Sequence, residues 1–192
     1  MRQRVGEIIR CQPDVITILI GSNDALATLN AENAARYVKQ MGLPRTPDKE
    51  WYARNLAAVV DRLQAETRAR IALLSLPPIT EDVSHAGYKR AIDYSAVVRQ
   101  VALEKNLTYL PLNEQMVDLI AKKPVIKKSD YKGGDRKGLY TAIVSHYLLG
   151  RDWDTIADDN GFLFLTDSIH LNGRGAKVVA DLITPFLQSK GD

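Results

Sequence analysis

Apolar residues follow two patterns that alternate along this chain. Nearly unbroken runs of β-branched and apolar residues lie at 15–20, 71–76 and 108–112. Longer stretches with the spacing of amphipathic helices lie at 2–11, 25–41, 51–70, 88–105 and 173–188. The first pattern is typical of strands covered on both faces, and the second of helices with one apolar face. Their alternation predicts an α/β fold with a parallel sheet.

The stretch from about 118 to 160 interrupts this alternation. It contains Gly133-Gly134 and an apolar helical segment at 139–149, and we expect the rest of it to be irregular. Connections of this length often form lids or binding loops. The apolar segment would suit an acyl chain if it formed a lid, or it would simply pack on the sheet. We therefore expect a single domain over 1–192, with an insertion at about 118–160.

Composition is typical of a globular protein and argues against several functions. Hydrophobic residues make up 45% of the chain and charged residues 26%. The formal net charge of +3 is too balanced to indicate nucleic-acid binding. The basic residues at 122, 123, 127 and 128 are interrupted by Pro124 and Val125, as in a solvated loop. A single cysteine and the absence of zinc-ligand spacing predict no metal, and we expect no organic cofactor.

The sequence also bears on membrane insertion and location. No apolar run approaches the ~20 residues that a membrane span requires. The basic residues at the start lead into an amphipathic helix and not into the apolar stretch of a signal peptide. As written, the chain is expected to be cytoplasmic, although a longer precursor could be exported.

The first run with chemical meaning is Asp167-Ser168-Ile169-His170, just before the last predicted helix. A carboxylate three residues before an imidazole can hold the ring in one tautomer and stabilise it when protonated. These two groups are the base half of a nucleophilic hydrolase. The alternative is structural, because Asp167 could equally cap the following helix, with Thr166 or Asn172 as rival caps.

The second run is Gly21-Ser22-Asn23-Asp24, at the end of the first predicted strand. Ligands of open α/β sheets bind beyond the carboxyl ends of the strands, which is where this run lies. The Asn23 side-chain amide could donate a hydrogen bond to an oxyanion there. The alternative is an ordinary turn, with Asp24 capping the next helix.

Together, the two runs resemble the SGNH (GDSL-type) hydrolases. The family's Gly-x-Asn-Asp block matches residues 21–24, and its Asp-x-x-His block matches residues 167–170. The likeness covers most of the chain apart from 118–160. It implies a three-layer α/β/α, flavodoxin-like fold and hydrolysis of a small-molecule ester. It also implies that His170 is the general base, Asp167 its orienting carboxylate and Asn23 an oxyanion donor, with Gly21 part of the same oxyanion and substrate site.

The chain departs from this family at the nucleophile. The family's Gly-Asp-Ser block precedes Gly-x-Asn-Asp, but no serine occurs among residues 1–20. The nearest string, Gly134-Asp135-Arg136, has no hydroxyl. Ser22 and Ser168 adjoin the two runs, but the family uses neither as a nucleophile. We therefore expect the N-terminal strands of the fold to be missing, as in a partial gene product, a truncated pseudoenzyme or a chain completed by a partner.

A missing first strand would expose the strand at 15–20 as an edge of the sheet. Exposed apolar edges tend to pair with other chains, so a dimer or another partner could cover it. The sequence thus favours a serine ester hydrolase whose serine lies outside this chain. Its substrate would be a lysophospholipid, a short acyl ester or an acetylated carbohydrate. The alternative is a catalytically inactive binding or structural module with the same fold.

Overall fold

The computed structural model describes residues 4–123 and 137–189. The basic residues Lys127 and Lys128 and the strings Gly133-Gly134 and Gly134-Asp135-Arg136 lie outside these ranges. The strands are β1 (Val15–Ile18), β2 (Arg70–Leu74) and β3 (Thr108–Leu110). The helices are α1 (Val5–Arg10), α2 (Ser22–Ala27), α3 (Ala31–Met41), α4 (Lys49–Glu66), α5 (Ala86–Glu104), α6 (Leu112–Ala121), α7 (Lys137–Tyr147), α8 (Trp153–Asp159) and α9 (Gly173–Gln188). The predicted α/β class with a parallel sheet is confirmed.

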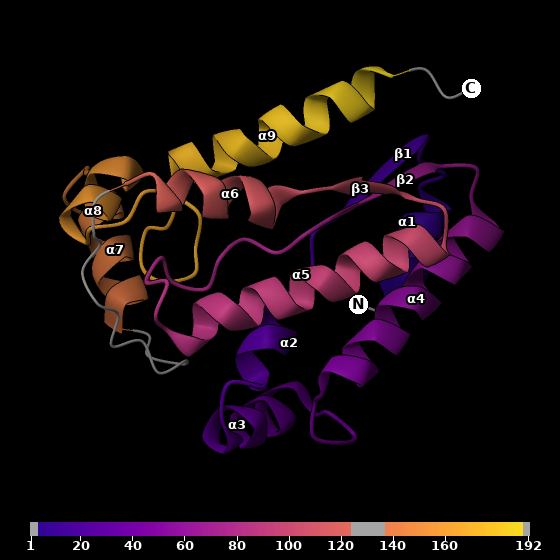
Figure 1. Cartoon of the computed structure of the whole chain (residues 1–192), viewed down its shortest axis with the longest axis horizontal. Helices are drawn as coiled ribbons and strands as arrows, with labels where there is room; N and C mark the ends of the chain where they lie inside the picture. Colours follow the sequence, from indigo (N-terminus) through magenta and orange to yellow (C-terminus); the bar gives the residue numbers. More distant parts are fainter. Residues whose placement is uncertain (1–3, 124–136, 190–192) are drawn as a thin grey trace.

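The described strands form one parallel sheet in the order β1-β2-β3. Helices cover both of its faces, with α4 and α5 along one side and α9 along the other (Figure 1). Both faces need a cover because the side chains of the central strand β2 alternate between them. Ile71 and Leu73 enter the core cluster shared with α1, α4 and α5, whereas Ala72 and Leu74 enter the cluster shared with α6 and α9. An unbroken apolar strand is therefore buried on both faces, as expected.

The first strand differs from this expectation. Ile16 and Ile18 are buried, but Val15 and Thr17 are only partly buried. Among the described residues, β1 pairs only with β2 and forms an edge of the sheet. The unbroken apolar pattern of 15–20 thus overestimates how much of this strand is covered. The expectation of an edge strand at this position is confirmed for the described residues.

Two predicted elements have different boundaries in the structure. The stretch 25–41 is divided into α2 and α3, because Thr28 ends the first helix and the Asn30 side chain caps the second by accepting from the Asn33 N–H at 2.8 Å. The strand predicted at 108–112 stops at Leu110, and α6 begins at Leu112. The Asn113 N–H donates to the Ser75 hydroxyl at 2.8 Å, which ties this helix start to the end of β2.

The region 118–160 is more helical than the sequence suggested. Its described residues contain the end of α6 and all of α7 and α8. The described part of α7 packs on α8 rather than on the sheet. The predicted apolar helix at 139–149 is thus confirmed in outline, and the expectation of otherwise irregular chain is wrong for α8.

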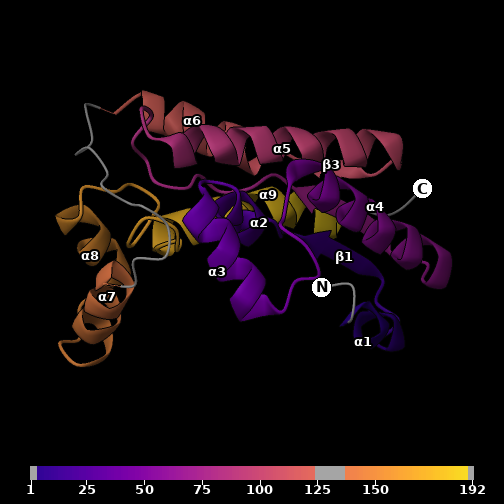
Figure 2. The ribbon, with the colours of Figure 1, turned by 90° about the horizontal axis from the view of Figure 1, so that it is seen from below.

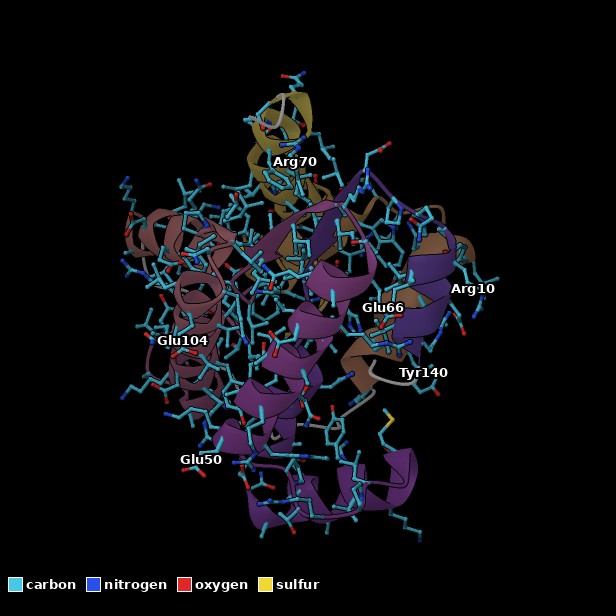
Figure 3. All side chains as sticks on the ribbon, turned by 90° about the vertical axis from the view of Figure 1, so that its right-hand side faces the viewer. Arg10, Glu50, Glu66, Arg70, Glu104 and Tyr140 are labelled. Atoms are coloured by element: carbon cyan, nitrogen blue, oxygen red, sulfur yellow. The ribbon has the colours of Figure 1, made fainter. Side chains whose placement is uncertain are left out.

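One end of the molecule collects the elements that follow the strands. The segments after β1 and β2, together with α7, α8 and the start of α9, lie at the end toward which these strands point (Figures 1 and 2). At the opposite end, Arg70 starts β2 and donates to the Phe186 carbonyl at 3.0 Å and the Ser189 hydroxyl at 2.7 Å. Figure 3 shows Arg70 beside the end of α9. This contact anchors the last helix along the sheet.

Candidate active site

A tight loop before α9 presents the Asp-x-x-His run. Leu165 and Leu171 form an antiparallel bridge, and the Thr166 N–H donates to the His170 carbonyl at 2.7 Å. At the base of the loop, the Asn172 side chain caps α9 by accepting from the Gly175 N–H at 2.8 Å. Asn172, and not Asp167, is therefore the helix cap.

Asp167 and His170 form a direct hydrogen bond. The His170 Nδ1–H donates to Asp167 Oδ2 at 2.7 Å. The other carboxylate oxygen, Oδ1, accepts the backbone N–H groups of Ser168, Ile169 and His170 at 2.7, 2.9 and 2.9 Å. Oδ1 therefore holds the loop backbone, and Oδ2 orients the His170 ring. This arrangement selects the tautomer in which Nε2 is the basic nitrogen.

The pair is buried on the carboxylate side and open on the imidazole side. The Asp167 side chain is 11% exposed and that of His170 is 56% exposed. Burial favours a higher pKa for Asp167, but the hydrogen bonds from the His170 ring and from the loop N–H groups outweigh it and lower the pKa below its ordinary value. The hydrogen bond to Asp167 raises the pKa of His170 against the opposing effect of burial. An oriented imidazole with strengthened basicity can act as a general base.

The loop after β2 contacts this loop directly and was missed by sequence reasoning. The Thr80 N–H donates to the Ser168 carbonyl at 2.7 Å. The neighbouring Glu81 is 1% exposed and accepts three backbone N–H groups from 163–165. The sequence shows only an acidic residue a few positions after a buried strand and two prolines. This pattern does not predict which groups the side chain contacts.

Asn23 and Gly21 lie at the end of β1, at the same end of the sheet as the Asp-His pair. Asn23 is the second residue of α2 and is exposed, and its Oδ1 accepts from the Tyr37 hydroxyl at 3.0 Å. This contact occupies the amide oxygen of Asn23, so its N–H₂ group is the part that can donate to a ligand. Ile169 packs against the same large core cluster to which Ala25 and Leu26 of α2 belong.

Gly21 is required by the backbone and by its neighbour. Its φ of 126° disfavours any residue with a Cβ, and a Cβ there would lie 2.6 Å from the Tyr52 hydroxyl. Tyr52 in turn donates to the Ile20 carbonyl at 2.9 Å. Gly21 therefore sets the close approach of α4 to the end of β1, and its membership of the oxyanion site stays a prediction.

A cleft of about 460 Å³ adjoins Asn23. Its lining includes Ile20, Asp24, Tyr37, Trp51 and Tyr52. Burial raises the pKa of Asp24, since little solvent reaches this carboxyl group. The cleft thus combines aromatic side chains with a few polar groups, a composition that suits an organic ligand.

The start of α7 lies against the Asp-His loop. A Cβ added at Gly138 would lie 3.5 Å from the Asp167 Cβ. Farther along the same segment, Tyr147, Leu148 and Leu149 are exposed by 73%, 77% and 68%. The idea that this helix merely packs on the sheet is therefore wrong for its described part. Its possible role as a lid stays a prediction.

Other candidate groups have structural partners. His85 caps α5 by accepting from the Gly87 N–H at 2.9 Å, and His146 stacks on Trp153 at 4.0 Å between ring centroids. Within residues 4–123 and 137–189, no three His, Cys, Asp or Glu side chains are placed to hold a metal ion. None of the described helices combines the length and apolarity that a bilayer crossing requires.

The geometry agrees with a comparison of the sequence with known families. Residues 1–178 match the GDSL-like lipase/acylhydrolase family. The chain belongs to this family. The resemblance inferred from residues 21–24 and 167–170 is thereby confirmed at the level of the family. No curated protein matches this GDSL-like chain in sequence.

Solved structures share the fold of this GDSL-like protein at low identity. The acetyl xylan esterase AlAXEase is 17% identical with a TM-score of 0.62, and the match covers 97% of this chain and 73% of that one. The acetylxylan esterase Axe2 from Geobacillus stearothermophilus is 16% identical with a TM-score of 0.62, covering 98% and 66%. LAE5, an α/β hydrolase from the metagenome of Lake Arreo in Spain, is 16% identical with a TM-score of 0.58, covering 96% and 66%. A serine-to-alanine and an aspartate-to-alanine form of Axe2 are described as catalytic mutants.

Proposed function

We propose that this GDSL-like protein is a serine ester hydrolase in which His170 is the general base and Asp167 its orienting partner. The observation that carries the proposal is the 2.7 Å hydrogen bond from His170 Nδ1 to Asp167 Oδ2. It leaves Nε2 as the basic nitrogen of a half-exposed ring. Among the described residues, none is hydrogen-bonded to Nε2, so this nitrogen is available for a substrate or a nucleophile.

We infer the following reaction for this pair of residues. A serine hydroxyl attacks the ester carbonyl while its proton passes to His170 Nε2, and Asp167 stabilises the resulting imidazolium. The tetrahedral adduct collapses, and the leaving alcohol takes up that proton. Water then attacks the acyl-serine with the same base and restores the hydroxyl. The Asn23 amide, oriented by Tyr37, would donate to the oxyanion in both steps, a contribution typically of about 3–4 kcal/mol.

The serine in this proposal comes from outside residues 1–192. No serine precedes Gly21, where the family places its Gly-Asp-Ser block. The chain also spans only 66–73% of the solved esterase chains named above. Among the described residues, one edge of β1 has no partner strand. It offers a place for a further strand that would bring the nucleophile close to His170. A preceding segment of a longer product, or a different partner chain, would each fulfil this role.

The substrate we propose is a small ester, with two acyl classes to distinguish. The exposed apolar residues near the end of α7 favour a lipid-like acyl chain, as in a lysophospholipid. The solved relatives favour an acetylated carbohydrate, since two of those compared are acetylxylan esterases. A catalytically inactive binding module is the remaining alternative, and it would keep the fold without turnover.

The test begins with the protein purified from its source cells. We expect it to hydrolyse p-nitrophenyl esters, and the ratio of acetate to octanoate turnover separates the two acyl classes, with acetylated xylo-oligosaccharides as a further substrate. Intact mass, N-terminal sequencing and labelling with a fluorophosphonate should identify a reactive serine outside residues 1–192. His170→Ala should lower kcat by roughly 10⁴–10⁶-fold, because the serine then lacks its base.

His146→Ala is the matched control, because the described contacts of the His146 ring are with Trp153, Tyr147 and the Arg151 carbonyl. It should leave turnover nearly unchanged. A fluorophosphonate adduct on Ser22 or Ser168 would contradict the proposed origin of the nucleophile. A native product with no ester hydrolysis and no labelled serine would instead indicate the inactive module.

A further inference from the structure

Glu81 is a buried carboxylate to which the proposed reaction assigns no role. It lies in the loop between β2 and α5 and is 1% exposed. Acidic side chains are almost never buried this completely unless they are paired or hydrogen-bonded. The partners of Glu81 therefore indicate why the fold retains a carboxylate at this position.

Those partners are three consecutive backbone N–H groups. Glu81 Oε2 accepts from Leu163 at 2.7 Å, and Oε1 accepts from Phe164 at 2.6 Å and from Leu165 at 3.0 Å. The segment 163–165 leads directly into Thr166 and Asp167. On its other side, it is held by the Asn172 N–H, which donates to the Phe164 carbonyl at 2.9 Å. Glu81 thus completes the hydrogen bonding of the strand-like segment that carries the Asp-His loop.

A second contact ties the same two loops on the other side of Asp167. Thr80 has a positive φ of 57°, and its N–H donates to the Ser168 carbonyl at 2.7 Å. The loop after β2 therefore contacts the Asp-His loop both before and after Asp167. Two adjacent residues of one loop bracket the carboxylate that orients His170.

We propose that Glu81 is a positioning residue that holds the Asp167 carboxylate in register with the His170 ring. It acts through the backbone of 163–165 and touches neither the ring nor the reacting atoms. The proposal deepens the proposed function, on which it rests for its catalytic meaning, but its structural content concerns the Asp167–His170 pair alone. It can therefore be tested without ester turnover.

The charge surroundings of Glu81 agree with this role. Burial raises the pKa of Glu81, whereas the three N–H groups and Lys123 oppose that rise. Tyr88, which packs nearby, has its pKa raised by burial and by the charge of Glu81. Hydrogen bonds from three donors favour the carboxylate form, and only a group with two acceptor oxygens can accept all three in this geometry.

The decisive experiment measures the pKa of His170 by NMR titration of its ring signals in the full chain. Glu81→Gln replaces one acceptor oxygen with an N–H₂ group that faces a backbone N–H. We expect the Asp-His loop to loosen and the pKa of His170 to fall toward the ordinary histidine value. His146 provides an internal reference signal, because its ring contacts Trp153, Tyr147 and the Arg151 carbonyl, away from the loop that carries Glu81.

Two further variants separate positioning from other effects. Glu81→Asp keeps the charge but has a shorter side chain, so its carboxylate cannot contact all three N–H groups. A positioning role therefore predicts a lower pKa of His170 in this variant too. The same variant replaces Glu81→Gln in the test if Glu81→Gln does not fold. Glu114→Gln is the matched control, since Glu114 accepts from Ser75 and Tyr109 and does not contact the Asp-His loop. It should lower the melting temperature at most and leave the pKa of His170 unchanged.

The remaining outcomes would overturn the proposal. An unchanged pKa of His170 in folded Glu81→Gln or Glu81→Asp would mean that Glu81 only stabilises the fold. A fall in Glu81→Gln alone would mean that its charge acts on His170 directly. If the pKa falls in both variants while the native protein hydrolyses no ester, the positioning role stands and the proposed function fails.

Discussion

At the scale of single residues, the hydrogen bonds of the Asp167 carboxylate explain how the short run 167–170 holds an imidazole ring in one orientation. Its two oxygens accept four hydrogen bonds, three from the loop backbone and one from the imidazole. The loop bonds fix the carboxylate, so the ring does not have to order a mobile acid before it can bind a proton. The opposite pKa shifts of Asp167 and His170 are two consequences of the same contact.

These shifts predict how stability depends on pH. Because folding raises the pKa of His170 above 6.5, its contribution to stability is complete below that value and is lost as the pH rises through the folded pKa. Because folding lowers the pKa of Asp167 below 3.8, its contribution is present above that value and is lost as the pH falls through the folded pKa. The pair should therefore stabilise the protein most near pH 5, by about 1 kcal/mol once solvent screening of the half-exposed ring is allowed for.

The measurement compares free energies of unfolding by denaturant between the parent chain and His170→Gln from pH 4.5 to 8.5. The difference should be largest near pH 5 and shrink above pH 6.5. His146→Gln provides the reference, because His146 does not contact a carboxylate. A difference that stays constant over the whole range would show that the pair does not respond to protonation of His170.

At the scale of elements, the start of α9 is fitted closely to the segment that carries the Asp-His loop. Gly175 lies in the first turn of α9, and a Cβ at this position would lie 2.6 Å from the Phe164 carbonyl oxygen. Phe164 is in turn held by Glu81 and by the Asn172 N–H. The helix can approach the loop this closely only because residue 175 has no side chain.

Gly175→Ala should therefore destabilise the protein. Alanine normally gains up to ~1 kcal/mol over glycine inside a helix, but the clash with a fixed carbonyl should outweigh this gain and leave a net loss of about 1–3 kcal/mol. Thermal unfolding measures the effect. Gly173→Ala on the same turn is the comparison, because the atoms nearest to its Cβ would be those of the Asp154 side chain, from 3.1 Å, and not a backbone carbonyl. If Gly175→Ala lowered the stability no more than Gly173→Ala, the backbone around Phe164 would have to shift at little energetic cost.

At the scale of the whole molecule, the sheet has one interior strand and two edges among the described residues. The central β2 pairs on both sides, whereas β1 pairs only with β2. An edge strand leaves backbone N–H and C=O groups available to another strand. The proposed origin of the nucleophile uses this edge, which links the architecture of the sheet to the chemistry at its carboxyl end.

Amide hydrogen exchange should show this asymmetry. In the 192-residue chain, amides of β1 should exchange at least about tenfold faster than those of β2, because local opening of an edge strand breaks fewer contacts. In the native product, a strand or a second copy on this edge should slow exchange in β1 and leave β2 nearly unchanged. Light scattering distinguishes a dimer from an added segment. Equal protection of β1 and β2 in the 192-residue chain would contradict an open edge.

The sequence alone was sufficient for the parts that depend on local pattern. Hydrophobic periodicity predicted the α/β class and most elements, because burial on one or two faces leaves a period in the chain. The Asp-His contact was predictable because it spans three residues and is closed by its own loop. The division of 25–41 and the start of α6 were not foreseen, since Asn30 and Asn113 act through hydrogen bonds that periodicity does not record.

Tertiary structure decided everything that joins distant segments. Glu81 lies 82 to 84 residues before the N–H groups that it accepts, so no local pattern could pair them. The same holds for Thr80 with Ser168, and for Tyr37 with Asn23. The sequence determined which chemical groups are present and how each segment folds, because these depend on side-chain type and local spacing. Only the packed sheet determined which groups meet, because parallel strands bring the loops at their carboxyl ends together whatever their separation along the chain.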